Sequence, residues 1–218
     1  EKGFYFANDI SLGPDGSLYV SSTYMDTATL TVNREAIVRF SERGHAEKVL
    51  YSVDHSSDTS TDNIGLIRSL KWTPAGLRFC MLREDGVHSL LVDAASGLLL
   101  NETITLFEGA RDRVIYATVS DDGEEVAFST AATEIYVASP PGSPPVKQYD
   151  GRELPTEIFS IPSDLHYLDR NLYFSDLGRD SLMRLTGTNA AEPIFDAAVA
   201  HSLGYDDDFF ECKYFQIA

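Results

Sequence analysis

A chain of 218 residues with 43% hydrophobic content is long enough to form one sizeable hydrophobic core. Its 34 acidic residues outnumber its 17 basic residues and give a formal net charge of −17. Because such a surface repels phosphate backbones and anionic membranes, we expect no nucleic-acid binding. The negative charge favours binding of cations or basic partners. The simpler interpretation is that the acidic residues only form a well-solvated surface.

The sequence begins with Glu1 and contains neither a bilayer-spanning apolar run nor a signal-peptide pattern. We therefore expect a processed chain or a piece of a longer one, without a transmembrane segment in this part. The sequence leaves the compartment open, with a secreted or membrane-anchored lumenal or extracellular location preferred. Cys80 and Cys212 lie in apolar strand-like runs without metal-ligand spacing, so we expect two buried free thiols and no structural zinc.

The first element in the chain is a hairpin. Strand-like runs at Ile10–Leu12 and Ser17–Ser22 flank Gly13-Pro14-Asp15-Gly16, where proline presets φ and glycine takes a conformation that other residues resist. The polar pair Asn8-Asp9 stands ahead of the first run, where a buried strand is normally apolar. After a long loop over Thr23–Glu35, two further strands complete a first unit: Ala36–Phe40 and Lys48–Tyr51.

Sets of about four short strands then recur, each spanning roughly forty to fifty residues. A polar loop over Tyr51–Asn63 separates the first two sets, and no stretch has a helical period of apolar residues. The later predicted strands are, in chain order, Ile67–Trp72, Leu77–Leu82, His88–Asp93 and Leu98–Leu106; Val114–Val119, Glu125–Ser129, Glu134–Ala138 and Val146–Tyr149; Leu165–Leu168, Asn171–Ser175, Ser181–Leu185 and Pro193–Phe195; and a half unit of His201–Tyr205 and Phe209–Ile217.

These units, at about residues 4–55, 64–106, 112–150, 157–197 and 200–218, predict an all-β propeller with about four and a half four-stranded blades in this chain. A β-sandwich also predicts evenly spaced strands, but not a turn and an LYV-like run once per unit, so we favour the propeller. A propeller closes its ring to cover its edge strands. The chain is therefore either five-bladed with an unusual closure or, as we prefer, part of a larger ring, which we take to be six-bladed.

Two stretches resemble known families. The pattern FAND-I-x-L-x-x-DG-x-LYVSST at residues 6–23 resembles the strictosidine-synthase-like proteins, within the group of six-bladed propellers that holds paraoxonases and gluconolactonases. AIVRFSERGHAEKVLY at Ala36–Tyr51 is similar to the next strands of that group. LYFSDLGRDSLMRLTGTNAAEPIF at Leu172–Phe195 is similar to a YWTD blade of the low-density-lipoprotein receptor.

The resemblance implies a site at the starts of the innermost strands, where the calcium-dependent members of the group gather side-chain oxygens around the propeller axis. Counted back from each hairpin turn, the position of Asn8 corresponds to Arg68, to Ile115, to Ser163 beside Asp164, and to His201. Asn8 matches the group's asparagine ligand for Ca²⁺, an ion that is coordinated by several oxygen ligands. Arg68 departs from the pattern, because its positive charge at about 4 Å from an ion costs several kcal/mol.

On this basis we predict a polar axial pocket that binds a small molecule. His201 is its general base, and Asp164 or Asp9 orients His201 or carries charge. The substrate-binding residues are Arg68, which holds an anionic group, Asp9 and Ser163. The alternative is that these polar side chains bind the exposed ends of inner strands and that Arg68 pairs with an aspartate. Ser163 lacks a GxSxG elbow and is not expected to act as a nucleophile.

The sequence is compatible with two functions and does not decide whether the protein is an enzyme. One is a strictosidine-synthase-like propeller with an axial small-molecule site, for which ester or lactone hydrolysis is the candidate reaction. The other is a non-catalytic protein-interaction propeller with a degenerate site. An extracellular receptor-like role rests on the YWTD-like blade and the glycosylation sequon at Asn101. We interpret Asp206-Asp207-Asp208 as an acidic turn and Trp72 as a core residue.

Overall fold

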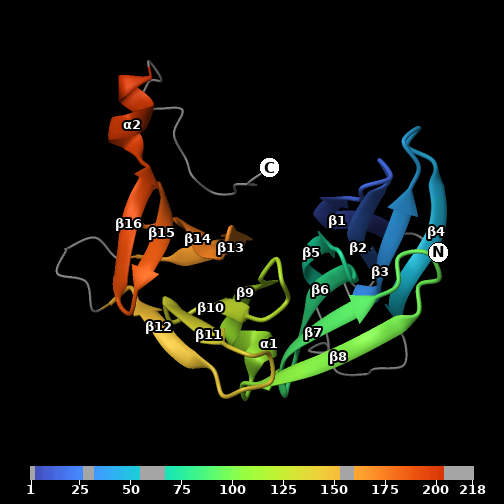
Figure 1. Ribbon diagram of the computed structural model, residues 1–218, viewed down its shortest axis with the longest axis horizontal. Coiled ribbons are helices and arrows are strands. Elements are labelled where there is room, and N and C mark those ends of the chain that lie inside the picture. Colours follow the sequence, from blue (N-terminus) through green and yellow to red (C-terminus); the bar gives the residue numbers. More distant parts are fainter. Residues whose placement is uncertain (1–2, 27–31, 55–66, 153–159, 204–218) are drawn as a thin grey trace. The chain divides into compact units, whose positions relative to one another are not determined.

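The computed structural model describes residues 3–26, 32–54, 67–152 and 160–203 (Figure 1). The chain divides into two compact units, Glu1–Arg111 and Asp112–Ala218. Each unit contains two four-stranded antiparallel sheets in which the strands follow one another in chain order. The four sheets are called first to fourth along the sequence.

The first unit holds the first and second sheets. The first sheet consists of β1 (Gly3–Leu12), β2 (Leu18–Asp26), β3 (Val32–Phe40) and β4 (Ala46–Asp54). The second sheet consists of β5 (Ile67–Thr73), β6 (Gly76–Arg83), β7 (Gly86–Val92) and β8 (Leu99–Leu106). The short helix α1 (Ala110–Arg113) follows β8.

The second unit holds the third and fourth sheets. The third sheet consists of β9 (Val114–Val119), β10 (Val126–Thr130), β11 (Glu134–Ala138) and β12 (Val146–Asp150). The fourth sheet consists of β13 (Pro162–Leu168), β14 (Asn171–Asp176), β15 (Ser181–Gly187) and β16 (Ala190–Phe195), and the helix α2 (Ala197–Ser202) follows it.

The β1–β2 turn forms as its sequence predicts. The Gly13 amide donates to the Ser17 carbonyl at 2.8 Å, and the Gly16 amide donates to the Gly13 carbonyl at 3.1 Å. Gly16 takes a φ of 74°, which a residue with a Cβ adopts only at a cost. The Asp15 carboxylate accepts a hydrogen bond from the Ser17 amide at 3.1 Å and closes the turn.

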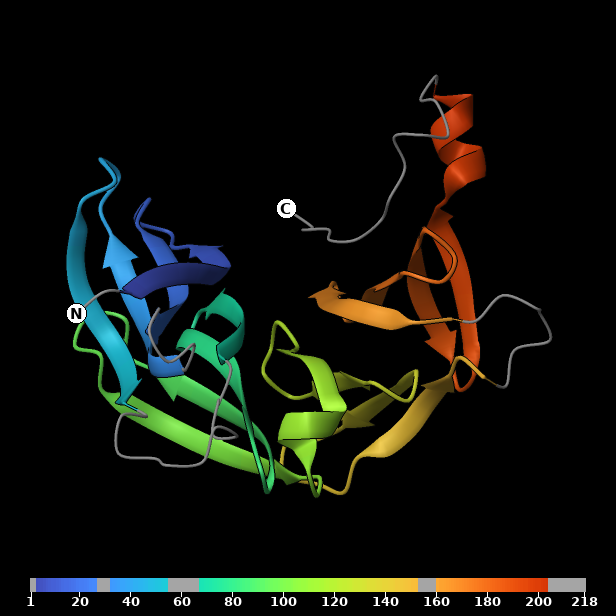
Figure 2. The ribbon, with the colours of Figure 1, turned by 180° about the vertical axis from the view of Figure 1, so that it is seen from behind.

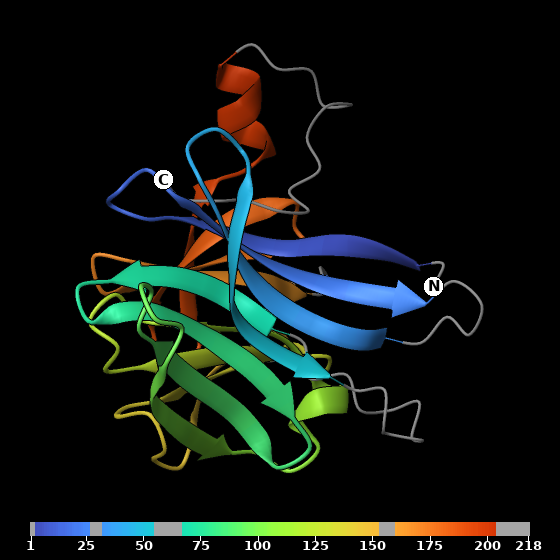
Figure 3. The same ribbon diagram turned by 90° about the vertical axis from the view of Figure 1, so that its right-hand side faces the viewer.

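In the first unit the two sheets pack together through β1, β2 and β5, and Figures 2 and 3 show them as neighbouring layers. Tyr19 and Ile37 of the first sheet meet Leu77 and Phe79 of the second in one buried cluster. Trp72 packs against this cluster with its ring centroid 5.3 Å from that of Tyr19, so its interpretation as a core residue is confirmed.

In the second unit the third and fourth sheets pack in the same way, through β9, β10 and β13. Tyr149 of the third sheet lies in one buried cluster with Leu165 and Phe174 of the fourth, and its ring centroid is 5.2 Å from that of Phe174. The repeat of one packing scheme in both units follows from the repeated strand order. Within each unit it places the first strand of one sheet against the first strand of the other, β1 against β5 and β9 against β13.

The polar pair Asn8-Asp9 was expected ahead of the first strand, and that expectation is wrong. Both residues lie inside β1, at a register shift between Ala7 and Asp9 where the strand carries one extra residue. The predicted loop over Thr23–Glu35 is also largely strand, because β2 runs to Asp26 and β3 starts at Val32. Residues 27–31 of that loop lie outside the described residues.

The predicted half unit begins with a helix instead of a strand. His201 lies in α2, where the Asp196 side chain accepts a hydrogen bond from the Val199 amide at 2.9 Å and caps the helix. An alanine-rich stretch after a capping aspartate favours a helix, and our strand prediction overlooked it. The predicted strand Phe209–Ile217 and the acidic turn at Asp206 lie outside the described residues.

Cys80 is a buried free thiol, as predicted, whereas Cys212 lies outside the described residues. In the described part of the chain, neither helix is long and apolar enough to cross a bilayer.

Candidate binding pocket

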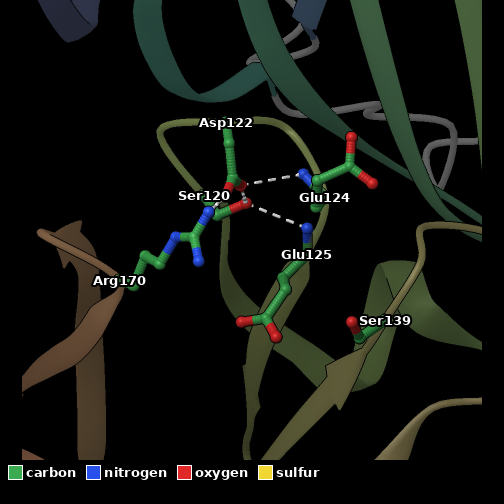
Figure 4. A pocket seen from close by; sticks show the side chains of 6 residues that line it. All are labelled: Ser120, Asp122, Glu124, Glu125, Ser139 and Arg170. Carbon is green, nitrogen blue, oxygen red and sulfur yellow. Dashed lines mark hydrogen bonds and ion pairs between the residues drawn. The ribbon is translucent and has the colours of Figure 1, made fainter.

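Three turns of the second unit enclose a cavity of about 280 Å³. The β9–β10 turn contributes Ser120 and three acidic residues, the end of β11 contributes Ser139, and the β13–β14 turn contributes Arg170 (Figure 4). The lining residues are Ser120, Asp122, Glu124, Glu125, Ser139 and Arg170.

Hydrogen bonds within the β9–β10 turn fix the acidic side of the pocket. The Asp122 carboxylate accepts from the Ser120 hydroxyl at 2.7 Å and from the Glu124 amide at 3.1 Å. The Glu125 amide donates to the Ser120 hydroxyl at 2.9 Å, and Gly123 takes a φ of 77° at the tip. These bonds fix the backbone of the turn that carries Asp122, Glu124 and Glu125.

The fourth sheet supplies the opposite wall of the pocket. Asp169 and Arg170 both have positive φ, at 48° and 63°, which turns β13 tightly into β14. The Arg170 guanidinium reaches 3.3 Å from Asp122, although 84% of its side chain is exposed. The Tyr167 hydroxyl donates to Glu125 at 3.0 Å and ties β13 to the acidic turn.

The pocket is anionic at neutral pH. The hydrogen bond from Ser120 lowers the pKa of Asp122, with further contributions from the Glu124 amide and the Arg170 charge. Of the three carboxylates in the lining, Asp122 lies 3.3 Å from the Arg170 guanidinium. Among the described lining residues there is no histidine or cysteine, and the acidic side chains have the charge to form an ion pair with a basic side chain.

Of the predicted site residues of the first unit, Asp9 joins the two sheets. The Asn8 amide donates to Thr23 at 2.7 Å. The Asp9 carboxylate accepts from the Ile10 amide at 2.8 Å and, on the other sheet, from the Leu70 amide at 2.6 Å. Arg68 lies in β5, opposite Cys80 of β6. The Asp9 contacts are of the kind that the alternative describes, in which polar side chains bind the backbone of inner strands.

The predicted site residues of the second unit lie in two different elements. The Ser163 hydroxyl shares a hydrogen bond of 2.6 Å with Ser175, and the Ser163 carbonyl accepts from Ser129 of the neighbouring sheet at 3.1 Å. Asp164 lies 3.6 Å from the ring of His166, while the predicted base His201 is exposed in α2. A common channel that joins these residues to Asn8, Asp9 and Arg68 stays a prediction.

The residues around Asn8 offer a poor set of calcium ligands. Asp9 next to it already accepts two backbone hydrogen bonds. Within the described residues, no three or more His, Cys, Asp or Glu side chains are grouped so that they could hold an ion. Calcium at Asn8 therefore stays a prediction.

His88 is a buried histidine that lies between two carboxylates, and we did not predict this cluster from the sequence. The His88 ring lies 2.7 Å from Glu102 through Nδ1 and 2.8 Å from Asp85 through Nε2, and 3% of its side chain is exposed. The hydrogen bond with His88 lowers the pKa of Asp85. Only the register of β7 with β8 brings His88 and Glu102 together, and no sequence pattern marks that pairing.

These sheets define the class of fold. Four-stranded antiparallel sheets with sequential strand order, packed within each unit through their first strands, are the arrangement of β-propeller blades. Comparison with solved structures agrees, and the prediction of an all-β propeller is confirmed.

The chain is similar to an auxiliary nutrient binding protein from Bacteroides ovatus ATCC 8483, at 12% identity and a TM-score of 0.56 over 86% of this chain and 46% of that one. It is similar to the Dos1 propeller at 14% identity and a TM-score of 0.51 over 83% of this chain and 44% of that one. A third likeness is to the C-terminal WD40 domain of Sif2, at 16% identity and a TM-score of 0.49 over 88% and 47% of the two chains.

The chain thus spans less than half the length of these three structures. Likenesses at such low identity establish the fold alone. No protein-family model matches the chain, and no curated protein matches it. The strictosidine-synthase-like resemblance stays a prediction.

Proposed function

We propose that this propeller is a non-catalytic interaction module that binds a basic peptide segment of a protein partner. The binding site in this proposal is the pocket between the β9–β10, β11–β12 and β13–β14 turns. The observation that carries the proposal is the lining, in which three acidic residues (Asp122, Glu124 and Glu125) outnumber one basic residue, Arg170.

The size of the pocket supports a side chain as its ligand. Its volume of about 280 Å³ lies just below the ~300–1,000 Å³ of typical small-molecule sites. A lysine or arginine side chain of a peptide fits such a volume, and its flanking residues can lie along the exposed turns. The formal net charge of −17 would also steer a basic partner toward the protein.

The roles of the inner-strand residues support a non-catalytic function. Asp9 accepts a hydrogen bond from the neighbouring sheet, and Ser163 takes part in two hydrogen bonds. The Asp9 side chain and the Ser163 backbone carbonyl thus stabilise the packing of one blade on the next, and the Ser163 hydroxyl is held within its own blade. They are poorly placed to change partners during a reaction.

Titration calorimetry with a short peptide of alternating arginine and serine tests the proposal. Glu124→Lys is expected to weaken the binding about tenfold or more, because it places a cation in the pocket; tenfold corresponds to about 1.4 kcal/mol. The control is Glu42→Lys, in the exposed β3–β4 turn of the other unit, which changes the net charge by the same amount. It should change the dissociation constant by less than about twofold.

Equal losses in the two variants would mean that the peptide senses the overall charge and not the pocket. That result, or a wild-type protein that does not bind the peptide at low salt, overturns the proposal. Binding is also expected to weaken as salt rises, because screening reduces the attraction between exposed charges.

A second candidate function is hydrolysis of an ester or lactone, in a six-bladed ring of the strictosidine-synthase-like type with calcium at Asn8. One observation favours it: the Asp164 carboxylate lies 3.6 Å from the His166 ring, and such pairs serve in general acid–base catalysis. Assays on aryl esters and lactones with and without Ca²⁺ test it. Turnover that is lost in both Asp164→Asn and His166→Gln would support it, and absence of turnover would reject it.

A further inference from the structure

One modification motif of the sequence lies on the last strand of the second sheet. Asn101-Glu102-Thr103 is an acceptor triplet for an N-linked glycan, and no other asparagine of the sequence is followed two residues later by serine or threonine. All three residues belong to β8. Because so short a triplet also arises by chance, its position in the fold decides whether it is a usable acceptor.

The acceptor nitrogen of the triplet is accessible. Asn101 is exposed, and its side-chain amide donates a hydrogen bond to the Thr103 hydroxyl at 3.3 Å. Residues two apart in a strand lie on the same face, so the extended backbone of β8 holds the two groups of the motif side by side. A sugar chain attached to Nδ2 of Asn101 therefore extends into solvent and requires no rearrangement of the sheet.

The strand that carries the triplet also has an open edge. The strand order of the second sheet is β5-β6-β7-β8, so β8 pairs with β7 on one side, and on its other side it pairs with no strand of the described part of the chain (Figure 1). Neighbouring blades of a propeller pack on the faces of a sheet and leave the edge of its outermost strand unpaired. The peptide groups along such an edge are a template for pairing with a strand of another chain.

The amino-acid composition of β8 does not protect this edge. The outermost strands of the other three sheets each contain a residue that discourages edge pairing, namely Lys48 in β4, Lys147 in β12 and Pro193 in β16. The strand β8 contains no lysine, arginine or proline, and it exposes 50% of Leu100 and 68% of Leu106. It is therefore the outermost strand that most needs another kind of cover.

The single charged side chain of β8 is engaged within its own sheet. The Glu102 carboxylate lies 2.7 Å from the His88 ring on β7 and 3.7 Å from the Arg83 guanidinium on β6. Because these groups offset its charge, Glu102 does little to repel an approaching strand. Apolar segments of high β propensity without a free charge or a proline are the ones that pair between chains.

We propose that Asn101 carries an N-linked glycan and that this glycan shields the open edge of β8. In the reaction, Nδ2 of Asn101 attacks the anomeric carbon of a lipid-linked oligosaccharide diphosphate, on an oligosaccharyltransferase of the secretory pathway. A bond from nitrogen to that carbon forms, the bond from the carbon to the phosphate oxygen breaks, and the lipid diphosphate leaves while Nδ2 loses one proton. The hydrated oligosaccharide then excludes a second strand from the edge. This proposal is independent of the acidic pocket, which lies in the other unit.

Mass spectrometry of the protein isolated from its native source tests the modification. The tryptic peptide of residues 84–111 contains Asn101 as its only asparagine. This peptide should carry the mass of an oligosaccharide, and peptide-N-glycosidase in heavy-oxygen water should convert Asn101 to an aspartate that contains the heavy oxygen. An unmodified peptide in the native protein overturns the proposal.

Secretory expression in a eukaryotic cell line, behind a cleaved signal peptide, tests the shielding. Thr103→Ala destroys the triplet, whereas Thr103→Ser keeps it and is the matched control. In size-exclusion chromatography, Thr103→Ala should lack the glycan and lose monomer to aggregate under conditions in which wild type and Thr103→Ser stay monomeric. Leu100→Lys in the Thr103→Ala background should restore the monomer, because a lysine protects an edge strand.

Asn101→Gln separates loss of the glycan from any effect of the Thr103 side chain. It removes the acceptor at an exposed position, so it should fold, as checked by thermal unfolding, and should lose monomer as Thr103→Ala does. The shielding is overturned if Asn101→Gln and Thr103→Ala stay monomeric for as long as Thr103→Ser. It is also overturned if Leu100→Lys does not restore the monomer, because the aggregation would then not depend on the edge of β8.

Discussion

Replacing Asp9 by alanine tests whether this residue serves to join two blades. The Asp9 carboxylate accepts hydrogen bonds from the Leu70 amide at 2.6 Å and the Ile10 amide at 2.8 Å. Leu70 is 6% exposed, so water replaces the lost acceptor poorly. A hydrogen bond to a charged group contributes about 1.5–3 kcal/mol, and we expect Asp9→Ala to lower the free energy of unfolding by about 2–3 kcal/mol.

The single tryptophan of the chain reports on this contact. Trp72 follows Leu70 in β5, its amide donates to the Ser11 hydroxyl at 3.0 Å, and its ring packs near Tyr19. Urea unfolding followed by Trp72 fluorescence therefore measures the stability of the first unit. Glu42→Ala, at an exposed turn, is the control and should change the free energy by less than about 0.5 kcal/mol.

An Asp9→Ala variant whose free energy of unfolding lies within about 0.5 kcal/mol of wild type would show that Asp9 does not join the two blades. Combined with a loss of turnover on an ester or lactone, that result would assign Asp9 to substrate binding, as the family resemblance implies.

Three further predictions concern buried polar groups. Asp176 is buried and accepts from the Ser160 hydroxyl at 2.6 Å and the Ile161 amide at 2.9 Å, so Asp176→Ala should destabilise the second unit by about 2–3 kcal/mol, measured by hydrogen exchange of β13 and β14. Hydrogen bonding to Arg152 lowers the pKa of Asp150 in the folded protein. The carboxylate therefore stabilises the fold above the unfolded pKa of about 3.9, and this contribution is lost as pH falls through the lower folded pKa. Asp150→Asn should make the free energy of unfolding depend less on pH in the acidic range. Burial raises the pKa of Cys80 to about 12, so in a Cys212→Ser background a thiol reagent should modify Cys80 rapidly in urea and only slowly in the native protein.

The sequence predicts the blades well because local chemistry encodes them. The turn at Gly13-Pro14-Asp15-Gly16 and the recurring strand sets predict four four-stranded sheets, and the structure contains them. The helix around His201 was missed because we extended the strand period past Phe195, although Asp196 and the alanines after it are helix signals.

The site was harder to predict, because it depends on packing between sheets. Asp122 and Arg170 come from turns 48 residues apart in sequence, and only the contact of the third and fourth sheets brings them together. The role of Asp9 depends in the same way on an amide of another sheet, Leu70. A sequence motif can identify a conspicuous polar residue, but it does not show whether that side chain binds a ligand or the backbone of a neighbouring strand.

The most direct test of the proposed function is to map where a basic peptide binds. Hydrogen–deuterium exchange of the whole chain, with and without the arginine–serine peptide, locates the contact without mutations. We predict protection at Ser120–Glu125 and around Arg170, with little change in the first unit. Protection centred on β1 and β5, or none at saturating peptide, would contradict the account.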